Sequence, residues 1–254
     1  MPNTFWESFS VLVTVLFEEK GDEEKQSIFM SACKKGDVEI VHMLLEYTDF
    51  VPPATMISVA SENGHVTIVE RLLQKPIMCM DPSDDDNFAI RIASENGHVA
   101  VVDRLLQEPT RFVNPSDFDN YAIRFASENG HIEVVERLLQ DSRVDPFAVG
   151  NYAILWACRN GHIAVVDRLL QEITKYLIPF YYIHGSIRCS SYNGHADIVY
   201  ILLQYKRQDK RIYDDNDIGM DINKAKQRGY SDVVNILLQH KAHHDNKLDE
   251  HAYS

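Results

Sequence analysis

The sequence predicts an all-α solenoid of about seven helix-turn-helix units. Three features predict this fold: a repeat of about 33 residues, a glycine at one position of every repeat, and an aliphatic pair at a fixed offset after each glycine. Self-similarity with such a period is typical of solenoids, in which each unit packs only on its neighbours.

The glycines set the register of the repeat. They are Gly36, Gly64, Gly97, Gly130, Gly161, Gly194 and Gly229, and an aliphatic pair begins eight residues after each, from Leu44-Leu45 to Leu237-Leu238. Within a unit the apolar residues follow two short helical stripes on either side of the glycine. We therefore expect helix, turn, helix, with the glycine in the left-handed conformation that ends the first helix.

The two ends of the chain differ from the central repeats. Lys224 and Lys226 make the last inner helix polar, as the uncovered end of a solenoid requires. Residues 4–19 repeat the apolar stripe of a second helix, so we expect residues 1–21 to be an N-terminal capping helix. Residues 22–240 are then the repeat domain, and residues 241–254 are a polar C-terminal tail that we expect to be frayed.

These motifs are similar to those of the ankyrin-repeat family. The resemblance covers roughly residues 22–240 and depends on the period, the Asn-Gly-His turn and the Val-Val-x-x-Leu-Leu second helix. The usual Thr-Pro-Leu-His opening is replaced, for example by Phe88-Ala89-Ile90-Arg91. Prolines between the units remove backbone donors, so we expect short or poorly formed β-hairpin fingers.

Composition favours an intracellular protein that binds other proteins. The net charge of −13 disfavours nucleic acid as a partner and favours a protein with a basic surface. The four cysteines show no CxxC pair, and we expect them to be reduced and largely buried. The apolar run at residues 5–17 is too short to span a bilayer. We therefore expect a cytoplasmic monomer that does not bind membranes.

No motif indicates an enzyme, a cofactor or a metal. The histidines of the repeated turns are too far apart along the stack to share one ion, and in the ankyrin family the equivalent histidine links neighbouring loops by hydrogen bonds. His240, His243 and His244 lack a further ligand, and the aspartates at 81 and 84–86 lack the spacing of a calcium loop. We expect these aspartates to form a solvated acidic tip.

Binding is predicted on the concave surface, formed by the inner helices and turns, as the family resemblance implies. The position two residues before each turn glycine forms an acidic row of Glu62, Glu95 and Glu128, followed by Arg159 and Tyr192. Arg91 and Arg124, one turn earlier on the same helices, could partly neutralise Glu95 and Glu128. Apolar contact is predicted from the region of Trp156, Tyr181, Tyr182 and Tyr192.

Two questions stay open at this point. The aromatic segment 176–183 either exposes its side chains as an interface anchor or folds onto the body of the protein. The function is a protein-binding scaffold or adaptor. The alternatives are a host-directed effector from an intracellular bacterium or a large DNA virus, acting in the host cytoplasm, and an enzyme with a cryptic site between repeats.

Overall fold

The computed structural model describes residues 13–74, 81–107, 113–176, 181–206 and 215–252. Within these residues the chain is built from helices, and no strand occurs in them. Residues 13–18 are helical. Fourteen further helices form seven successive pairs: α2 (Asp22–Lys35) with α3 (Val38–Tyr47), α4 (Thr55–Glu62) with α5 (Val66–Gln74), α6 (Asp84–Glu95) with α7 (Val99–Leu106), α8 (Asp117–Glu128) with α9 (Ile132–Leu138), α10 (Ala148–Asn160) with α11 (Ile163–Tyr176), α12 (Tyr181–Asn193) with α13 (Ala196–Lys206), and α14 (Asp215–Arg228) with α15 (Ser231–Ala252).

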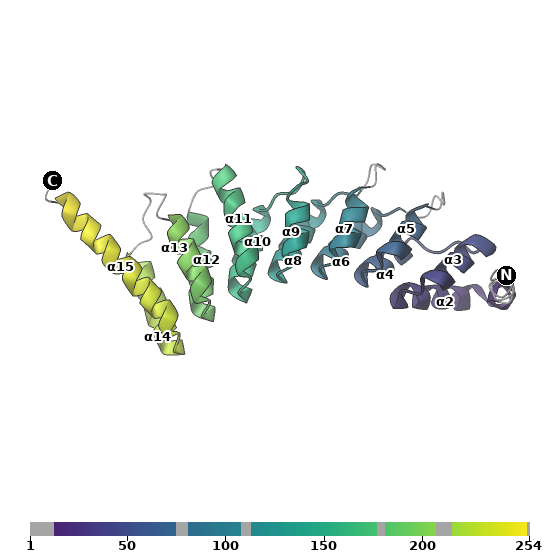
Figure 1. Cartoon of the computed structure of the whole chain (residues 1–254), viewed down its shortest axis with the longest axis horizontal. Helices are drawn as coiled ribbons and strands as arrows, with labels where there is room; N and C mark the ends of the chain where they lie inside the picture. The colour runs from purple at the N-terminus through teal and green to yellow at the C-terminus, as the bar shows by residue number, and fades with distance from the viewer. Residues whose placement is uncertain (1–12, 75–80, 108–112, 177–180, 207–214, 253–254) are drawn as a thin grey trace, which may run out of the picture. The chain divides into compact units, whose positions relative to one another are not determined.

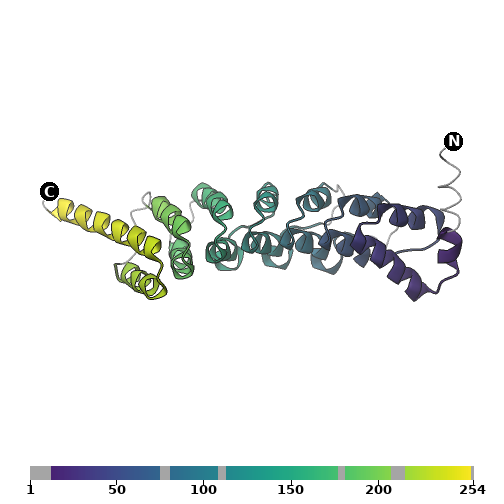
Figure 2. The same cartoon turned by 60° about the horizontal axis from the view of Figure 1, so that its bottom comes forward.

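The helices group into two compact units. The first unit comprises residues 1–122 and 140–144, and the second comprises residues 123–139 and 145–254, so the division passes through α8. In the first unit α2, α4 and α6 pack in sequence, as do α3, α5 and α7. In the second unit α10, α12 and α14 form one row, and α9, α11, α13 and α15 form the other (Figures 1 and 2). We call the even-numbered helices the first helices and the odd-numbered helices from α3 onward the second helices.

The core lies between the two rows and confirms the predicted repeat. The repeated Val-Val-x-x-Leu stripe is fully buried in α7, where Val101, Val102 and Leu105 have no exposed surface. Small residues on the first helices are also buried, as Ala60 and Ala93 show. Fully burying an aliphatic side chain contributes about 1.5–3 kcal/mol, and the same stripe recurs in each pair.

The turn within each pair has the predicted left-handed glycine. At Gly64 the φ angle is +76°, and a Cβ atom placed there would lie 2.6 Å from Nδ1 of His98, in the next repeat. The ring of His98 also contacts the carbonyl oxygen of Glu62, with 2.9 Å between Nε2 and O. The glycine is therefore required by its backbone angle and by the close neighbouring ring. This confirms that the repeated histidines link successive turns.

A left-handed turn at the start of three first helices takes the place of the expected β-finger. Asp85, Asp86 and Asn87 have φ angles of 53°, 53° and 59°, and the same conformation recurs at residues 118–120 and 149–151. The Asp81 carboxylate accepts from the Ser83 amide at 2.9 Å, and the Asn87 amide donates to the Ser83 carbonyl at 3.0 Å. These local bonds favour a compact turn over a hairpin ladder.

The buried asparagine that ends this turn links successive repeats. The Asn87 side-chain amide donates to Asp117 at 2.6 Å, and its carbonyl oxygen accepts from the Asn114 backbone amide at 2.8 Å. Left-handed backbone costs a non-glycine residue roughly 1–2 kcal/mol, so the network must offset the strain at Asp85, Asp86 and Asn87. The side chains of Asp84, Asp85 and Asp86 are exposed, as expected for a solvated acidic tip.

The C-terminal segment differs from the expectation of a frayed tail. Helix α15 continues through residues 241–252. The segment contains no glycine or proline, and it contains the strong helix formers Ala242, Lys247, Leu248 and Glu250. Nothing in the sequence therefore ends the helix where we placed its end. At the preceding first helix, Lys224 and Lys226 are exposed, as a polar end requires.

Candidate partner-binding surface

Glu95 and Glu128, two of the three residues of the predicted acidic row, each accept a hydrogen bond from a tyrosine of the following repeat. The Tyr121 hydroxyl donates to Oε2 of Glu95 at 2.6 Å, and the Tyr152 hydroxyl donates to Oε2 of Glu128 at the same distance. Both glutamates are half-buried. They therefore join successive repeats, a role that the sequence analysis did not assign to them.

Glu62 is the exposed member of the row. The residue of the following repeat that corresponds to Tyr121 and Tyr152 is Phe88, which has no hydroxyl group. Glu62 therefore cannot form the tyrosine contact. Of the three glutamates, Glu62 presents its charge most directly to solvent.

Arg91 is held by its own turn and by aromatic rings. Its guanidinium donates to the carbonyl oxygens of Asp85 at 2.8 Å and Asp86 at 2.9 Å, and only 9% of the residue is exposed. It also lies 4.7 Å from the ring centroid of Phe118 and 5.3 Å from that of Tyr121. Arg91 thus stabilises the left-handed turn, whereas the sequence suggested a role in neutralising Glu95.

Phe118 is an exposed aromatic that the sequence analysis missed. It is 58% exposed and has a φ angle of +56°, although it is not glycine. Large apolar side chains in exposed, strained backbone are typical of binding surfaces. The available signal was an aromatic residue among the polar residues at the start of α8.

The second unit brings Trp156 and Arg159 together on α10. The Tyr152 and Trp156 rings stack with centroids 5.3 Å apart and an interplanar angle of 27°. The Arg159 guanidinium lies 4.3 Å from the Trp156 ring centroid. Residues at these spacings share one stripe of a helix, so Tyr152 and Arg159 flank Trp156 from opposite sides along it.

An arginine guanidinium also lies over the ring of Tyr192. The residue is 43% exposed, and the Arg228 guanidinium lies 3.5 Å from its ring centroid. Tyr192 belongs to α12 and Arg228 ends α14, and these helices are neighbours in the row of first helices. We call Tyr152, Trp156, Arg159, Tyr192 and Arg228 the arginine–aromatic surface.

Tyr181 and Tyr182 form the first turn of α12, where we had expected a loop. Their side chains, like that of Tyr176, lie outside the described residues. Ile183, which follows them, is fully buried. The binding role predicted for the two tyrosines stays a prediction.

The surroundings of one tyrosine and three cysteines raise their pKa values. Burial, together with the hydrogen bond to Glu128, raises the pKa of Tyr152 to about 12. Burial raises the pKa of the Cys33 thiol to about 12 and also raises the pKa values of Cys158 and Cys189. These three cysteines are free thiols, and they are protonated and weakly nucleophilic near neutral pH. Cys79 lies outside the described residues.

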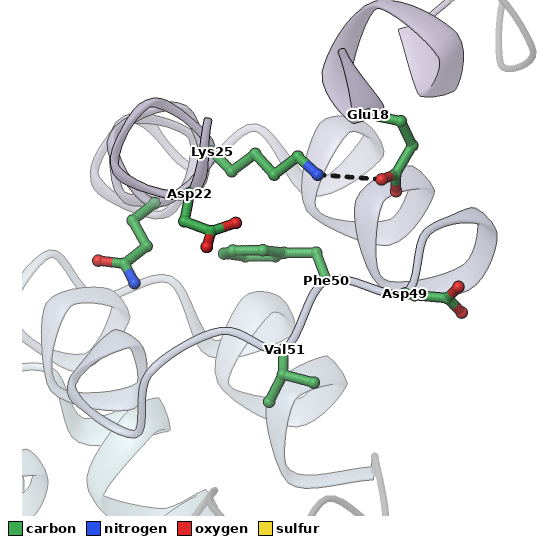
Figure 3. Close-up of a pocket in the computed structure, with 7 residues that line it drawn as sticks. Glu18, Asp22, Lys25, Asp49, Phe50 and Val51 are labelled. Carbon is green, nitrogen blue, oxygen red and sulfur yellow. Dashed lines mark hydrogen bonds and ion pairs between the residues drawn. The ribbon is translucent and has the colours of Figure 1, made fainter. Parts of the chain in front are cut away.

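A hollow of about 340 Å³ lies near the N-terminus, between the loop after α3 and the start of α2. Figure 3 shows Asp22, Lys25 and Glu18 around the ring of Phe50. The Lys25 ammonium donates to the Glu18 carboxylate at 3.0 Å. The lining contains no serine, cysteine or histidine that could act as a nucleophile or base partner.

The described residues contain neither a metal-binding cluster nor a membrane-spanning helix. No group of three or more histidine, cysteine or acidic side chains is arranged there to hold a metal ion. In the same residues no helix is long and apolar enough to cross a bilayer.

Comparison with known proteins shows the family. The family model for ankyrin repeats (3 copies) matches residues 29–117 and 90–178, which together cover more than half of the sequence. The chain therefore belongs to the ankyrin-repeat family. Members of this family are generally protein–protein interaction modules, and the fold is typically non-catalytic.

A crystal structure of an ankyrin repeat domain from Acinetobacter baumannii has the same fold. It is 17% identical in sequence, with a TM-score of 0.52, and the match covers 74% of this chain and 98% of that domain. At this identity the likeness concerns the fold alone. No curated protein sequence is significantly similar to the chain.

Proposed function

We propose that this chain is a protein-binding scaffold that uses the surface of its first helices. The arginine–aromatic surface of the second unit is the observation that carries the proposal. It gathers aromatic and charged side chains on the first helices, and the core does not require them. Second helices contribute the aliphatic stripe of the core, and their exposed large apolar side chains are aliphatic apart from Tyr200. Aromatic and arginine side chains are the types most enriched among residues that dominate binding energy.

In the first unit the same surface is acidic and includes one exposed aromatic. Glu62 is exposed, as are Asp84, Asp85 and Asp86, and Phe118 lies beside Arg91. Exposed carboxylates attract a basic partner at long range, and an aromatic ring supplies apolar contact once the partner has docked. A basic protein surface is therefore the partner that we propose for this unit.

The site residues proposed for binding are Glu62, Trp156, Arg159, Tyr181, Tyr182 and Tyr192, with Phe118 added from the structure. Glu95 and Glu128 stay in the proposal as supporting residues, because each carboxylate holds a tyrosine that shapes the surface. We propose a cytoplasmic monomer that acts without a cofactor and does not bind nucleic acid.

Affinity capture followed by amide hydrogen exchange tests the proposal. The full chain, immobilised through its C-terminus, is used to capture proteins from lysate, and a captured protein is purified and mixed with the free chain. We expect protection from exchange in the first helices α4, α6, α10 or α12 and in the turns that follow them. Protection confined to the second helices α5, α7, α11 and α13 would show that the partner binds elsewhere.

A pair of charge reversals provides the matched control. Glu62→Lys changes the exposed first-helix carboxylate, and Glu39→Lys makes the same change on the exposed surface of the second helix α3. We expect the first substitution to weaken capture of a basic partner and the second to leave it unchanged.

A further inference from the structure

Two arginines of the second unit have exposed guanidinium groups that rest on aromatic rings. Arg159 lies on Trp156 and Arg228 lies on Tyr192. Both arginines are exposed, and among the described residues neither has a carboxylate within 4.0 Å. Their hydrogen-bond donors are therefore available to a ligand.

Neighbouring arginines of the same unit have acidic partners. Arg188 donates to Asp217 at 2.7 Å and lies 3.7 Å from Asp221, and Arg168 pairs with Glu172 at 2.8 Å. A guanidinium at a helix C-terminus gains from the helix dipole, which accounts for the charge at Arg159 and Arg228. The dipole does not account for the aromatic ring beneath each guanidinium. The ring fixes the side chain in advance and lowers the entropy lost when a ligand binds.

We propose that the arginine–aromatic surface binds an extended acidic segment of a protein partner. One carboxylate pairs with Arg159, a second pairs with Arg228, and an apolar side chain between them contacts Tyr192. This inference rests on the proposed function and adds the chemical class of the ligand. A guanidinium matches a carboxylate through two parallel N–H···O bonds, which makes arginine well suited to this recognition.

The spacing of the two arginines suits a short peptide. Arg159 lies in the last turn of α10 and Arg228 ends α14, and α12 lies between these helices in the row. Packed helix axes lie about 8–10 Å apart, so the axes of α10 and α14 are roughly 16–20 Å apart. An extended chain covers that distance in about five or six residues.

The distribution of charge permits an acidic ligand on this unit. The first unit contains 22 aspartate and glutamate residues and 10 lysine and arginine residues, whereas the second contains 16 and 15. The net charge of −13 therefore belongs mainly to the first unit. An acidic segment approaching the second unit meets a nearly neutral body on which Arg159 and Arg228 are exposed.

The same features favour a peptide over a nucleic acid. Binding to single strands uses open aromatic faces on which bases stack, together with a row of cations along the backbone. The Trp156 ring is flanked by Tyr152 and Arg159, and Tyr192 is covered by Arg228. At both positions a guanidinium therefore occupies a ring face on which a base could otherwise stack.

Tryptophan fluorescence of the full chain tests the inference. The sequence has two tryptophans, so Trp6→Phe leaves Trp156 as the sole reporter at the proposed site. The probe is the acetylated and amidated heptapeptide Glu-Glu-Ser-Phe-Ser-Glu-Glu. We expect a saturable change in Trp156 emission whose midpoint rises with salt concentration. Absence of a response up to millimolar peptide would overturn the inference.

Variants at the two arginines test the contacts. Arg159→Gln and Arg228→Gln should each weaken binding at least about tenfold, because each removes charge-assisted hydrogen bonds. Arg159→Lys should retain only part of the affinity, since lysine lacks the planar fork. Lys241→Gln removes the same charge from the second helix α15 and should change nothing. Equal losses from Arg228→Gln and Lys241→Gln would contradict a specific site.

Two further probes separate the possible ligands. The same heptapeptide with lysine in place of glutamate should not bind, and neither should a single-stranded oligothymidylate. Tighter binding of the oligonucleotide, lost in Arg159→Gln, would replace the inference with nucleic-acid binding. If a captured protein protects the first helices while the acidic heptapeptide fails to bind, the inference is wrong and the proposed function stands. If the heptapeptide binds and no protein protects these helices, the proposed function fails instead.

Discussion

The hydroxyl group of Tyr152 donates a 2.6 Å hydrogen bond to the carboxylate of Glu128 in the preceding repeat. Tyr121 makes the equivalent bond to Glu95. The contact follows the register of the repeat and is missing where Phe88 takes the place of tyrosine. It therefore couples neighbouring repeats and also determines which glutamate stays exposed.

Removing this bond should destabilise the protein, and adding it should stabilise the protein. We expect Tyr152→Phe to lower the free energy of unfolding by about 0.5–1.5 kcal/mol, since a half-buried carboxylate loses its donor. Phe88→Tyr should supply Glu62 with the missing hydroxyl and raise stability by up to about 1 kcal/mol. Chemical denaturation of both variants measures the effects. Equal destabilisation by the two changes would show that the repeats are not equivalent here.

Burial of Tyr152, together with the same bond, predicts a loss of stability in alkali. The folded-state pKa of Tyr152 is raised from 10.0 to about 12, so between these values the folded protein keeps a proton that the unfolded chain has lost. Stability should therefore fall as pH rises through this window. The difference in thermal midpoint between the wild type and Tyr152→Phe should be largest below pH 10 and should shrink toward pH 12. A difference that grows with pH would reverse the sign we assign.

Three glycine substitutions separate backbone strain from close packing. Gly64→Ala should cost about 2 kcal/mol or more, because its φ angle is +76° and the new Cβ would meet His98. Gly150 has a φ angle of +67°, but no atom lies within 4 Å of the position of a new Cβ. Gly150→Ala should therefore cost about 1 kcal/mol. Gly219→Ala, in open space within α14, should stabilise the helix by about 0.5–1 kcal/mol. Thermal unfolding followed by circular dichroism gives the order, and a harmless Gly64→Ala would contradict the turn geometry.

Core and end positions should differ sharply in their tolerance of alanine. Leu105 is fully buried in α7, so Leu105→Ala should cost about 2–5 kcal/mol. Lys226 is exposed on α14, so Lys226→Ala should change stability by less than about 0.5 kcal/mol. Urea denaturation measures both, and similar losses would mean that the core has been misplaced.

The period of the sequence was sufficient to predict the helical repeat. Each turn glycine combines a special backbone angle with a fixed distance to the leucine stripe, so local and long-range signals agree. The left-handed turns at residues 85–87, 118–120 and 149–151 could not be predicted in the same way. Left-handed backbone at aspartate, phenylalanine and valine opposes local preference, and it depends on bonds such as that between Asn87 and Asp117 in the next repeat.

The binding surface was predicted only in part. The row of Glu62, Glu95 and Glu128 follows from the repeat register, but the register does not show which carboxylate a tyrosine will reach. The partnership of Tyr192 with Arg228 joins residues 36 positions apart on different helices. The sequence carries no pattern for that pair beyond the presence of an arginine near a helix end.

The most direct measurement of the central claim is the binding kinetics of a captured basic partner at two salt concentrations. Glu62→Lys should slow association and weaken its dependence on salt while leaving dissociation nearly unchanged, because exposed charges act by steering. Trp156→Ala and the change of Tyr181 and Tyr182 to serine should instead speed dissociation, since aromatic anchors hold a formed complex. Glu39→Lys, on the second helix α3, should leave both rates unchanged. Slower association in Glu39→Lys with unaltered kinetics in Glu62→Lys would show that the second helices bind the partner, which would contradict the account.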